Sequence, residues 1–219
     1  MQIIAPRDLS MLLARCHAIA GTTIGQLAWQ TGVEMPVDLS RHKGWFGMLL
    51  ERALGATAGN RQAPDFEALG IEMKTLPLNH LGQPKESTYV CTVALQEKGS
   101  MTWQQSWVKR KLSKVLWVPV EADNQIALAD RYIGQAFLWQ PTMKQEQQLQ
   151  HDWEVLMDKV VLGELASISA KEGDYLQIRP KAAHSRILAV GSAKDGSVAR
   201  TNPKGFYLRS RFTKQLLNG

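Results

Sequence analysis

The sequence has little cysteine and histidine and no long apolar run. Its two cysteines, Cys16 and Cys91, are far apart, and its five histidines are scattered without the spacing of a zinc site. A disulfide framework and a zinc enzyme are therefore disfavoured, and both cysteines are expected to be core residues in a reducing compartment. No segment approaches the ~20 apolar residues that span a membrane, and the start lacks the order of a signal peptide. We expect a soluble, cytoplasmic protein with no membrane partner.

Positive charge is concentrated towards the C-terminal end. The net charge is +6, and residues 169–219 hold ten Lys or Arg against three Asp or Glu, a net of +7, which leaves −1 for the rest. A second basic cluster comprises Lys109, Arg110, Lys111 and Lys114, although a single run of this kind is more simply a solvated face. The charge predicts an anionic partner, with nucleic acid ahead of a membrane.

Hydrophobic residues make up 44% of the 219 residues, so a sizeable core is available to one domain, or to one domain with two lobes. Periodicity and turn residues predict an ordered series of elements. The expected helices are one carrying Leu9 to Cys16, one from its cap Thr23 through Gln30, one preceded by Asp38 or Ser40 and ending at Gly55, and the segments 142–164 and 212–217. The expected strands are 69–77, 87–95, 114–121 with Pro119 marking its end, 132–139, 175–181 and 205–208. This order predicts an α/β or α+β fold with a mixed sheet flanked by helices.

Asp65, Glu72 and Lys74 form the most informative segment. Residues two apart on a strand share a face, so Glu72 and Lys74 are expected on one face and Met73 on the other. Asp65 follows a proline, where the chain is expected to turn. Two carboxylates suit a hard cation such as Mg²⁺, and a neighbouring lysine can hold a water for phosphodiester hydrolysis. Taken alone, however, this spacing is more simply a solvated strand face.

Five blocks in order give a more specific signal. They are Lys43 to Glu51, the segment from Asp65 to Lys74, Lys111 to Val120, Tyr175 to Ala183, and Gly205 to Leu208. Together the blocks resemble the MutH family of methyl-directed DNA mismatch repair endonucleases, and more distantly restriction enzymes that cut the same short site. The resemblance extends from about Leu12 to Leu217. It implies a single restriction-endonuclease-like domain over 1–219, with two arms around a DNA cleft: a catalytic arm including about 40–120 and a DNA-reading arm including about 165–219.

The resemblance also implies an activity. Members of the family nick the unmethylated strand of hemimethylated GATC sites, 5′ to the G, with Mg²⁺ as cofactor. Their substrate is double-stranded DNA with hemimethylated or unmethylated GATC, and MutL activates them after MutS has found a mismatch. We expect a monomer, and a single active site per monomer predicts a nick rather than a double-strand break. Two alternatives stay open: a non-catalytic DNA-binding module, and a type II restriction endonuclease that cuts both strands at GATC.

Residue roles follow from position in the matching blocks. The catalytic and metal-binding set implied by the resemblance is Asp65 and Glu72 as ligands with the carbonyl of Met73, Lys74 for the attacking water, Glu51 in support of the metal site, and Lys111 near the scissile phosphate. The DNA-binding set is Lys43, Tyr89, Arg179, Pro180, Lys181 and Tyr207. Tyr89 lies outside the blocks and resembles a family aromatic position near the DNA, although a strand tyrosine is more often a packing residue. Arginine commonly reads guanine in the major groove, but taken alone Arg179 is more simply a phosphate contact without sequence information. The resemblance favours a base contact. Tyr207 is expected against adenine where a 6-methyl group projects, and Pro180 near the same spot.

Overall fold

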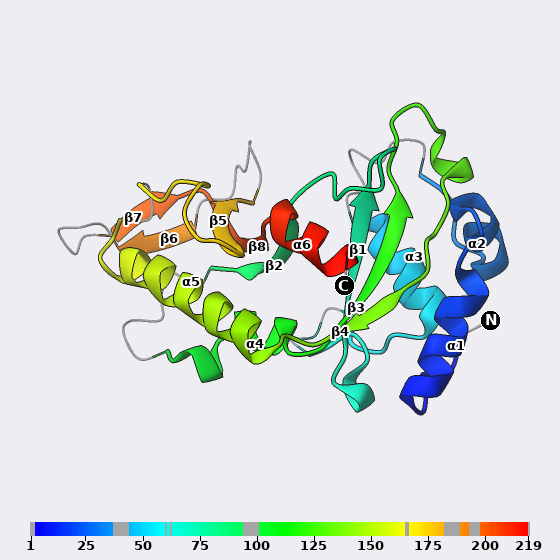
Figure 1. Cartoon of the computed structure of the whole chain (residues 1–219), viewed down its shortest axis with the longest axis horizontal. Helices are drawn as coiled ribbons and strands as arrows, with labels where there is room; N and C mark the ends of the chain where they lie inside the picture. Colours follow the sequence, from blue (N-terminus) through cyan, green and yellow to red (C-terminus); the bar gives the residue numbers. More distant parts are fainter. Residues whose placement is uncertain are drawn as a thin grey trace. The chain divides into compact units, whose positions relative to one another are not determined.

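The computed structural model describes residues 3–36, 44–59, 61, 63–93, 101–164, 167–181, 189–192 and 198–218, with side chains described except at 189–192 and 198–201. The chain divides into two compact units, Met1–Lys85 with Lys114–Gln140, and Glu86–Ser113 with Pro141–Gly219. Helices and mixed sheets confirm the predicted α/β class (Figure 1). The assignment of a catalytic and a DNA-reading arm stays a prediction, and residues 86–113, placed in the predicted catalytic arm, fold with the second unit.

The three helices predicted near the N-terminus are present in the first unit. They are α1 (Leu9–Ile19), α2 (Ile24–Thr31) and α3 (Trp45–Leu54). Thr23 begins α2 with a capping box that it forms with Gln26. Gly32 and Gly55 end α2 and α3 in the left-handed region, with φ of 64° and 83°, where glycine pays no steric penalty. These helices are therefore set by local signals.

The first unit also contains a three-stranded sheet. Its strands are β1 (Glu72–Leu78), β3 (Val115–Glu121) and β4 (Phe137–Trp139), and β3 is central. β3 runs parallel to β1 and antiparallel to β4, so the sheet is mixed as predicted. Lys74 lies opposite Trp117 in the register of β1 and β3. Paired residues of neighbouring strands project to the same face, so these two side chains are neighbours.

Two expectations for this unit need correction, and one lies outside the described residues. Pro119 does not end its strand, because β3 continues for two more residues. The carbonyl of Pro119 accepts a hydrogen bond from the N–H of Gly134 at 2.9 Å, so the side of Pro119 without a donor faces away from β1. No hydrogen bond to β1 is lost. The strand predicted over 132–139 is also shorter, since β4 begins at Phe137 and residues 132 and 133 form isolated bridges. Asp38 and Ser40 lie outside the described residues.

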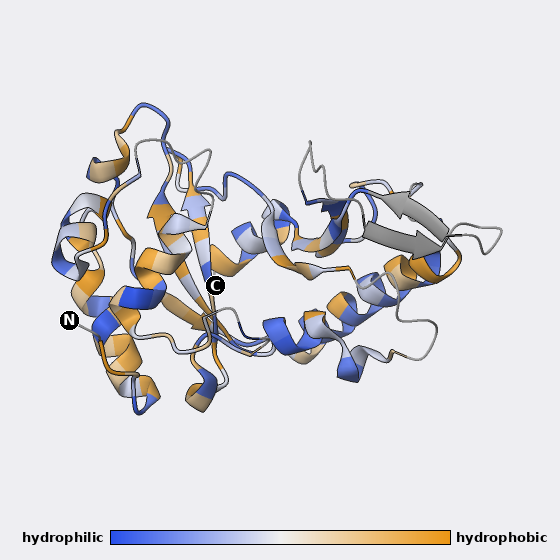
Figure 2. Ribbon diagram, turned by 180° about the vertical axis from the view of Figure 1, so that it is seen from behind, coloured by the Kyte–Doolittle hydropathy of each residue, from blue (hydrophilic) through white to orange (hydrophobic). Residues whose placement is uncertain are grey.

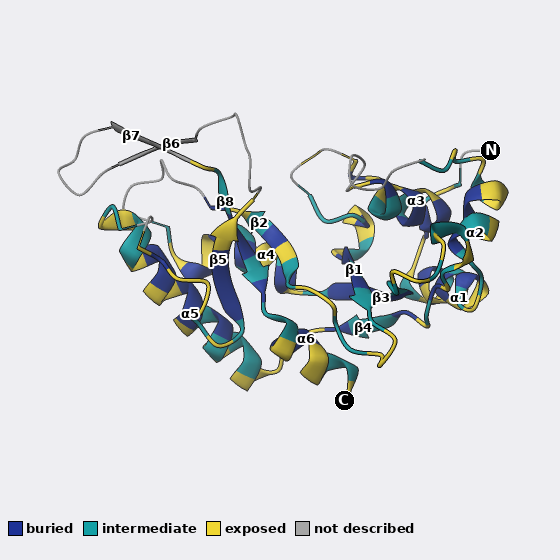
Figure 3. Ribbon diagram, turned by 90° about the horizontal axis from the view of Figure 1, so that it is seen from above, coloured by how far each residue is buried: buried dark blue, intermediate teal, exposed yellow. Residues whose placement is uncertain are grey.

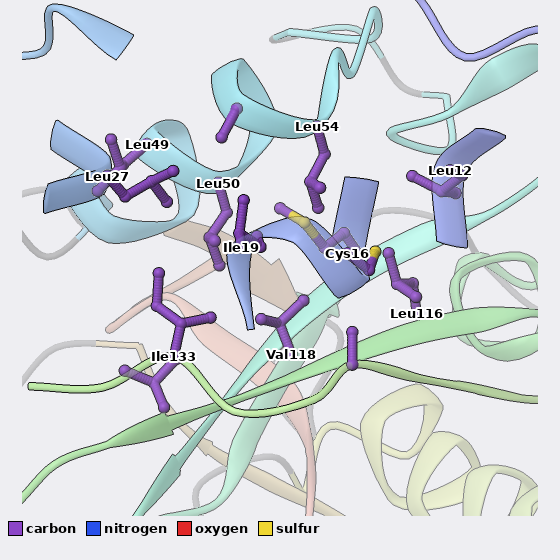
Figure 4. Close-up of a cluster of buried hydrophobic side chains, with 14 of the residues drawn as sticks. Leu12, Cys16, Ile19, Leu27, Leu49, Leu50, Leu54, Leu116, Val118 and Ile133 are labelled. Carbon is purple, nitrogen blue, oxygen red and sulfur yellow. The ribbon is translucent and has the colours of Figure 1, made fainter. Parts of the chain in front are cut away.

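One face of this sheet packs under the helices. The core side chains come from α1, α2, α3, β1, β3 and the segments beside them, and include Leu12, Cys16, Ile19, Leu27, Leu49, Leu50, Leu54, Ile71, Met73, Leu116, Val118 and Ile133 (Figure 4). Met73 belongs to this core, so strand alternation sends Glu72 and Lys74 to the opposite face. Burial raises the pKa of the Cys16 thiol to about 11, which fits its predicted core position. Cys91 is half-buried instead, on the second unit's sheet.

The second unit is built on an antiparallel sheet. Its strands are β2 (Thr88–Thr92), β8 (Lys204–Leu208) and β5 (Leu176–Pro180), with β8 central, and a separate hairpin joins β6 (Ala189–Ser192) to β7 (Val198–Thr201). Leu176 and Ile178 are buried on one face, and Arg179 is exposed. Figure 3 shows the exposed end of β5. The strands predicted around 87–95, 175–181 and 205–208 are thus confirmed, within the residues described.

The helices of the second unit are α4 (Trp107–Leu112), α5 (Met143–Val161) and α6 (Ser210–Leu217). The long helix predicted from Thr142 is α5, and Thr142 forms a capping box with Gln145. Apolar and polar stretches alternate along α5 (Figure 2). Its buried stripe contains Leu149, Trp153 and Leu156. This stripe is core, as its periodicity predicts.

Asp152 joins α5 to the start of β5. It is 3% exposed, and its Oδ2 accepts hydrogen bonds from the N–H groups of Asp174, Tyr175 and Leu176 at 2.9, 2.6 and 2.9 Å. Its Oδ1 accepts one from Gln148 at 2.9 Å. A buried carboxylate is tolerated because these donors replace its hydration. Asp152 therefore fixes the point at which β5 leaves the loop.

We expect Asp152→Asn to destabilise the protein by about 1–3 kcal/mol, because hydrogen bonds to a charged acceptor become bonds to a neutral amide. Asp158→Asn is the matched control, since Asp158 is an exposed carboxylate on the same helix, and a change within about 0.5 kcal/mol is expected there. Urea unfolding followed by circular dichroism measures both. Equal stability of the two variants would remove the role assigned to Asp152.

Candidate active site and nucleic-acid interface

Asp65 is anchored directly beside the start of β1. The chain turns through a short 3-10 helix (Glu67–Leu69) and closes with a bridge between Phe66 and Ile71. Gly70, with φ of 62°, permits this turn. The main-chain N–H of Met73 donates a hydrogen bond to Oδ2 of Asp65 at 2.7 Å. The structure thus brings Asp65 to the backbone between Glu72 and Lys74.

Glu72 and Lys74 form a buried ion pair on the non-core face of β1. They are 6% and 8% exposed, and Lys74 Nζ lies 3.4 Å from Glu72 Oε1. The prediction that the two side chains share a face is consistent with this contact. The solvated-strand interpretation does not fit, because both charges are removed from water. Burying two charges is costly even when they are paired, and departures from ordinary burial of this kind are expected mainly at functional sites.

Trp117 adds a polar group to this face. It is fully buried next to Lys74 in the register of β1 and β3. Its indole N–H has no hydrogen-bond partner in the part of the chain that the structure describes. An unsatisfied buried donor costs on the order of 1–3 kcal/mol, and native proteins keep few of them. The face beside Lys74 is therefore polar as well as buried.

The donor chemistry of this site suits a hard divalent cation. Asp65, Glu72 and the carbonyl of Met73 offer oxygen atoms only, which Mg²⁺ prefers. Within the described residues, no group of three or more His, Cys, Asp or Glu side chains is placed to hold a metal ion. Glu51 is half-buried on α3 and is not gathered with the two other carboxylates into such a set. Its supporting role stays a prediction.

Two other predicted residues lie elsewhere. Lys43 is outside the described residues. Lys111 lies in α4, in the second unit, so its contribution beside Asp65 stays a prediction. Of its basic neighbours, Lys109 pairs with Glu146 at 2.7 Å, and this contact lowers the pKa of Glu146. Arg110 lies 5.0 Å from the ring centroid of Trp107. The basic cluster is thus partly engaged in structural contacts.

Four predicted DNA-binding residues share one face of the second unit's sheet. Register places Arg179 opposite Gly205 on β8, and Tyr207 opposite Tyr89 on β2. The rings of Tyr89 and Tyr207 meet edge to face, with centroids 5.4 Å apart, and Lys181 Nζ lies 5.3 Å from the centroid of Tyr89. We call this surface the basic sheet face, and it comprises Ser87, Tyr89, Thr92, Gln177, Arg179, Lys181, Gly205 and Tyr207. Pro180 is exposed at the end of β5, between Arg179 and Lys181.

Gly205 makes the packing of this face possible. A Cβ atom at this position would lie 2.8 Å from Cε2 of Tyr89 and 3.2 Å from Cε2 of Tyr207. A glycine within a strand indicates such a close approach. The position of Gly205 in a predicted strand was therefore a signal for tight packing at this point. Ser87, Thr92 and Gln177 also lie on this face, and nothing in the local sequence distinguishes them.

Tyr207 stays neutral at physiological pH. Burial raises the pKa of its hydroxyl, and the nearby Tyr89 and Glu86 act in the same direction, while Arg179 opposes them. A neutral phenol donates and accepts hydrogen bonds. It can therefore pack against a base without adding charge to the face.

The first site combines oxygen ligands with a buried lysine, and the second is a basic aromatic surface. Sites of these two kinds are typical of enzymes that bind and cut DNA. The α/β fold is that of the restriction-endonuclease-like class. Residues 54–152 match the family model described as DNA mismatch repair enzyme MutH. None of the helices in the described ranges is long and apolar enough to cross a membrane.

Curated relatives match almost the whole chain. The DNA mismatch repair protein MutH of Haemophilus influenzae is 49% identical over 213 residues, 97% of this chain and 96% of the relative. The MutH protein of Histophilus somni is 50% identical, over 97% of this chain and 95% of the relative. That of Shewanella baltica is 48% identical, over 99% of this chain and 97% of the relative. The chain belongs to the MutH family of DNA mismatch repair enzymes. The predicted family and the prediction of an endonuclease are thereby confirmed.

Proposed function

We propose that the protein nicks the unmethylated strand of hemimethylated GATC sites, 5′ to the G, in a reaction that depends on Mg²⁺. The observation that carries the proposal is the anchoring of Asp65 at the N–H of Met73, beside the buried pair of Glu72 and Lys74. This arrangement supplies oxygen ligands and an ammonium group at one place. Family membership supports the same activity.

Asp65, Glu72 and the carbonyl of Met73 would hold the ion. When bound, Mg²⁺ supplies Lewis acidity and lowers the pKa of a water. Lys74 orients the attacking water, since its ammonium is held at Glu72 and is shielded from solvent. The water attacks the phosphorus in line, and one phosphorus–oxygen bond of the backbone breaks without a covalent enzyme intermediate.

Two further residues are proposed to assist. Lys111 stabilises negative charge on the phosphate. Glu51 supports the metal ligands from α3. Both roles rest on the family's pattern of residues.

The basic sheet face is proposed to read the site. Arg179 is exposed on β5, and its guanidinium can bond O6 and N7 of guanine. Tyr207 and Pro180 lie against adenine and oppose a 6-methyl group, while Lys181, Tyr89 and Lys43 contact the duplex. One methyl group is worth only ~1–3 kcal/mol through pocket fit, so strong strand selectivity needs a steric clash as well.

Family membership supports a proposal for the setting in which the protein acts. The protein acts as a monomer in the cytoplasm, with MutL as its activator and MutS upstream. Its DNA partners are hemimethylated and unmethylated GATC duplexes. Interaction with purified MutL is measurable as faster nicking.

A supercoiled plasmid that carries GATC sites tests the proposal. With Mg²⁺ we expect nicked circles, and none after chelation of divalent ions by EDTA. A plasmid without GATC and a fully adenine-methylated plasmid serve as controls and should stay supercoiled. Linear product would indicate a restriction endonuclease that cuts both strands. Salt-dependent binding without any cleavage, even with MutL present, would indicate a DNA-binding module.

A further inference from the structure

Ser87 occupies an unusual position on the basic sheet face. It lies just before β2, yet its hydrogen-bond partners are on β5, on the far side of the central strand β8. Gln177 Nε2 donates to Ser87 Oγ at 2.7 Å, and Arg179 Nη1 donates to the same oxygen at 3.2 Å. Strands two apart in a sheet are separated by about 9.6 Å. The long side chains of Gln177 and Arg179 therefore cross β8 to reach one hydroxyl.

The same arrangement recurs further along the sheet. Lys181 Nζ donates to Thr92 Oγ1 at 3.4 Å, and this oxygen also bonds the hydroxyl of Tyr89 at 2.9 Å. Polar side chains on β5 and just after it are thus directed, at two points, towards the hydroxyl groups of Ser87 just before β2 and Thr92 at its end. Gly205, which has no side chain, lies on the strand between them.

The chemistry of Ser87 makes it more than a packing residue. A serine hydroxyl has two acceptor lone pairs and one proton. Gln177 and Arg179 both donate to this oxygen, and together they occupy its two lone pairs. Gln177 is 5% exposed and so provides a rigid member of the set, whereas Arg179 is exposed at the strand end. Holding a guanidinium in place before binding reduces the ordering cost of a bidentate contact.

We infer that Ser87 is a positioning residue for base recognition: its hydroxyl fixes the Arg179 guanidinium against Gln177 and so sharpens the preference for GATC. This inference rests on the proposed function, in that Arg179 reads a guanine. It adds Ser87, which lies just before β2, to a surface for which the sequence predicted Tyr89, Arg179, Pro180, Lys181 and Tyr207.

Equilibrium binding without added Mg²⁺ tests the inference, because no strand is cut. Two duplexes are compared: one contains GATC, and in the other an A·T pair replaces the first G·C pair of GATC. The measured quantity is the Kd of the altered duplex divided by the Kd of the GATC duplex. Ser87→Ala should lower this ratio about five- to tenfold, the effect of one lost hydrogen bond, and Ser87→Thr should preserve it. Ser169→Ala is the matched control, an exposed serine of the same unit whose Oγ accepts a single main-chain N–H. It should leave the ratio unchanged.

Coupling to Arg179 separates positioning from a general structural role. In an Arg179→Ala background, Ser87→Ala should change the ratio less than twofold, because the group that it positions is gone. The inference would be overturned if Ser87→Ala weakened binding to both duplexes equally. It would also be overturned if Ser87→Ala changed the ratio as much in the Arg179→Ala background as in the wild-type protein. A wild-type protein without any preference for GATC would overturn it together with the proposed reading role. Preference for GATC without nicking would reject the proposed reaction alone and leave the inference supported by the binding ratios.

Discussion

Lys74→Ala is expected to reduce nicking of GATC plasmids by about 10³-fold or more while DNA binding stays nearly unchanged. Lys74 is 8% exposed and its ammonium lies 3.4 Å from Glu72. A preorganised charge in a water-excluded site contributes far more to a transition state than to binding. Single-turnover nicking rates and equilibrium binding to the same duplex measure the two effects.

Removal of Lys74 also leaves Glu72 buried without its cation, which is destabilising. Lys74→Gln is therefore measured as a second variant, because the glutamine amide can still donate a hydrogen bond to Glu72. Lys85→Gln is the matched control, since Lys85 is exposed in the same unit and bonds the carbonyl of Ala122 at 2.9 Å. Nicking at the wild-type rate by a folded Lys74→Gln protein would refute the role of Lys74.

Arg179→Ala is expected to abolish most discrimination between GATC and a duplex with the guanine replaced. A bidentate arginine–guanine contact is worth about 1–3 kcal/mol of discrimination, or roughly 5- to 150-fold. The loss should fall on the GATC duplex and spare the altered one. Competition binding with the two duplexes at fixed salt measures it.

Lys181→Ala provides the contrast. Removal of a lysine that contacts phosphates should weaken binding to both duplexes alike. It should also reduce the salt dependence of binding by about one charge. If Arg179→Ala gave this uniform pattern instead, Arg179 would be a phosphate contact without sequence information. The two substitutions thus separate reading from charge within one surface.

Much of the architecture was predictable because its signals are local. Thr23 and Thr142 begin helices through capping boxes, and Gly32 and Gly55 end helices at positive φ. Each signal involves residues within one turn of one another. The alternation that puts Met73 in the core is a property of any strand. The prediction that Pro119 ends its strand was wrong. Whether a proline interrupts a strand depends on which neighbouring strand its missing N–H would face.

Local sequence signals were sufficient to predict α1, α2, α3, α5 and α6, the principal strands, the family, and the face of β1 that carries Glu72 and Lys74, whereas α4 was not predicted. Three features are visible only in the folded chain: this pair is buried, Asp65 is anchored at the N–H of Met73, and Ser87 contacts Arg179, 92 residues away in sequence. Periodicity and capping act over a few residues, whereas these contacts exist only after turns and strand register have been fixed.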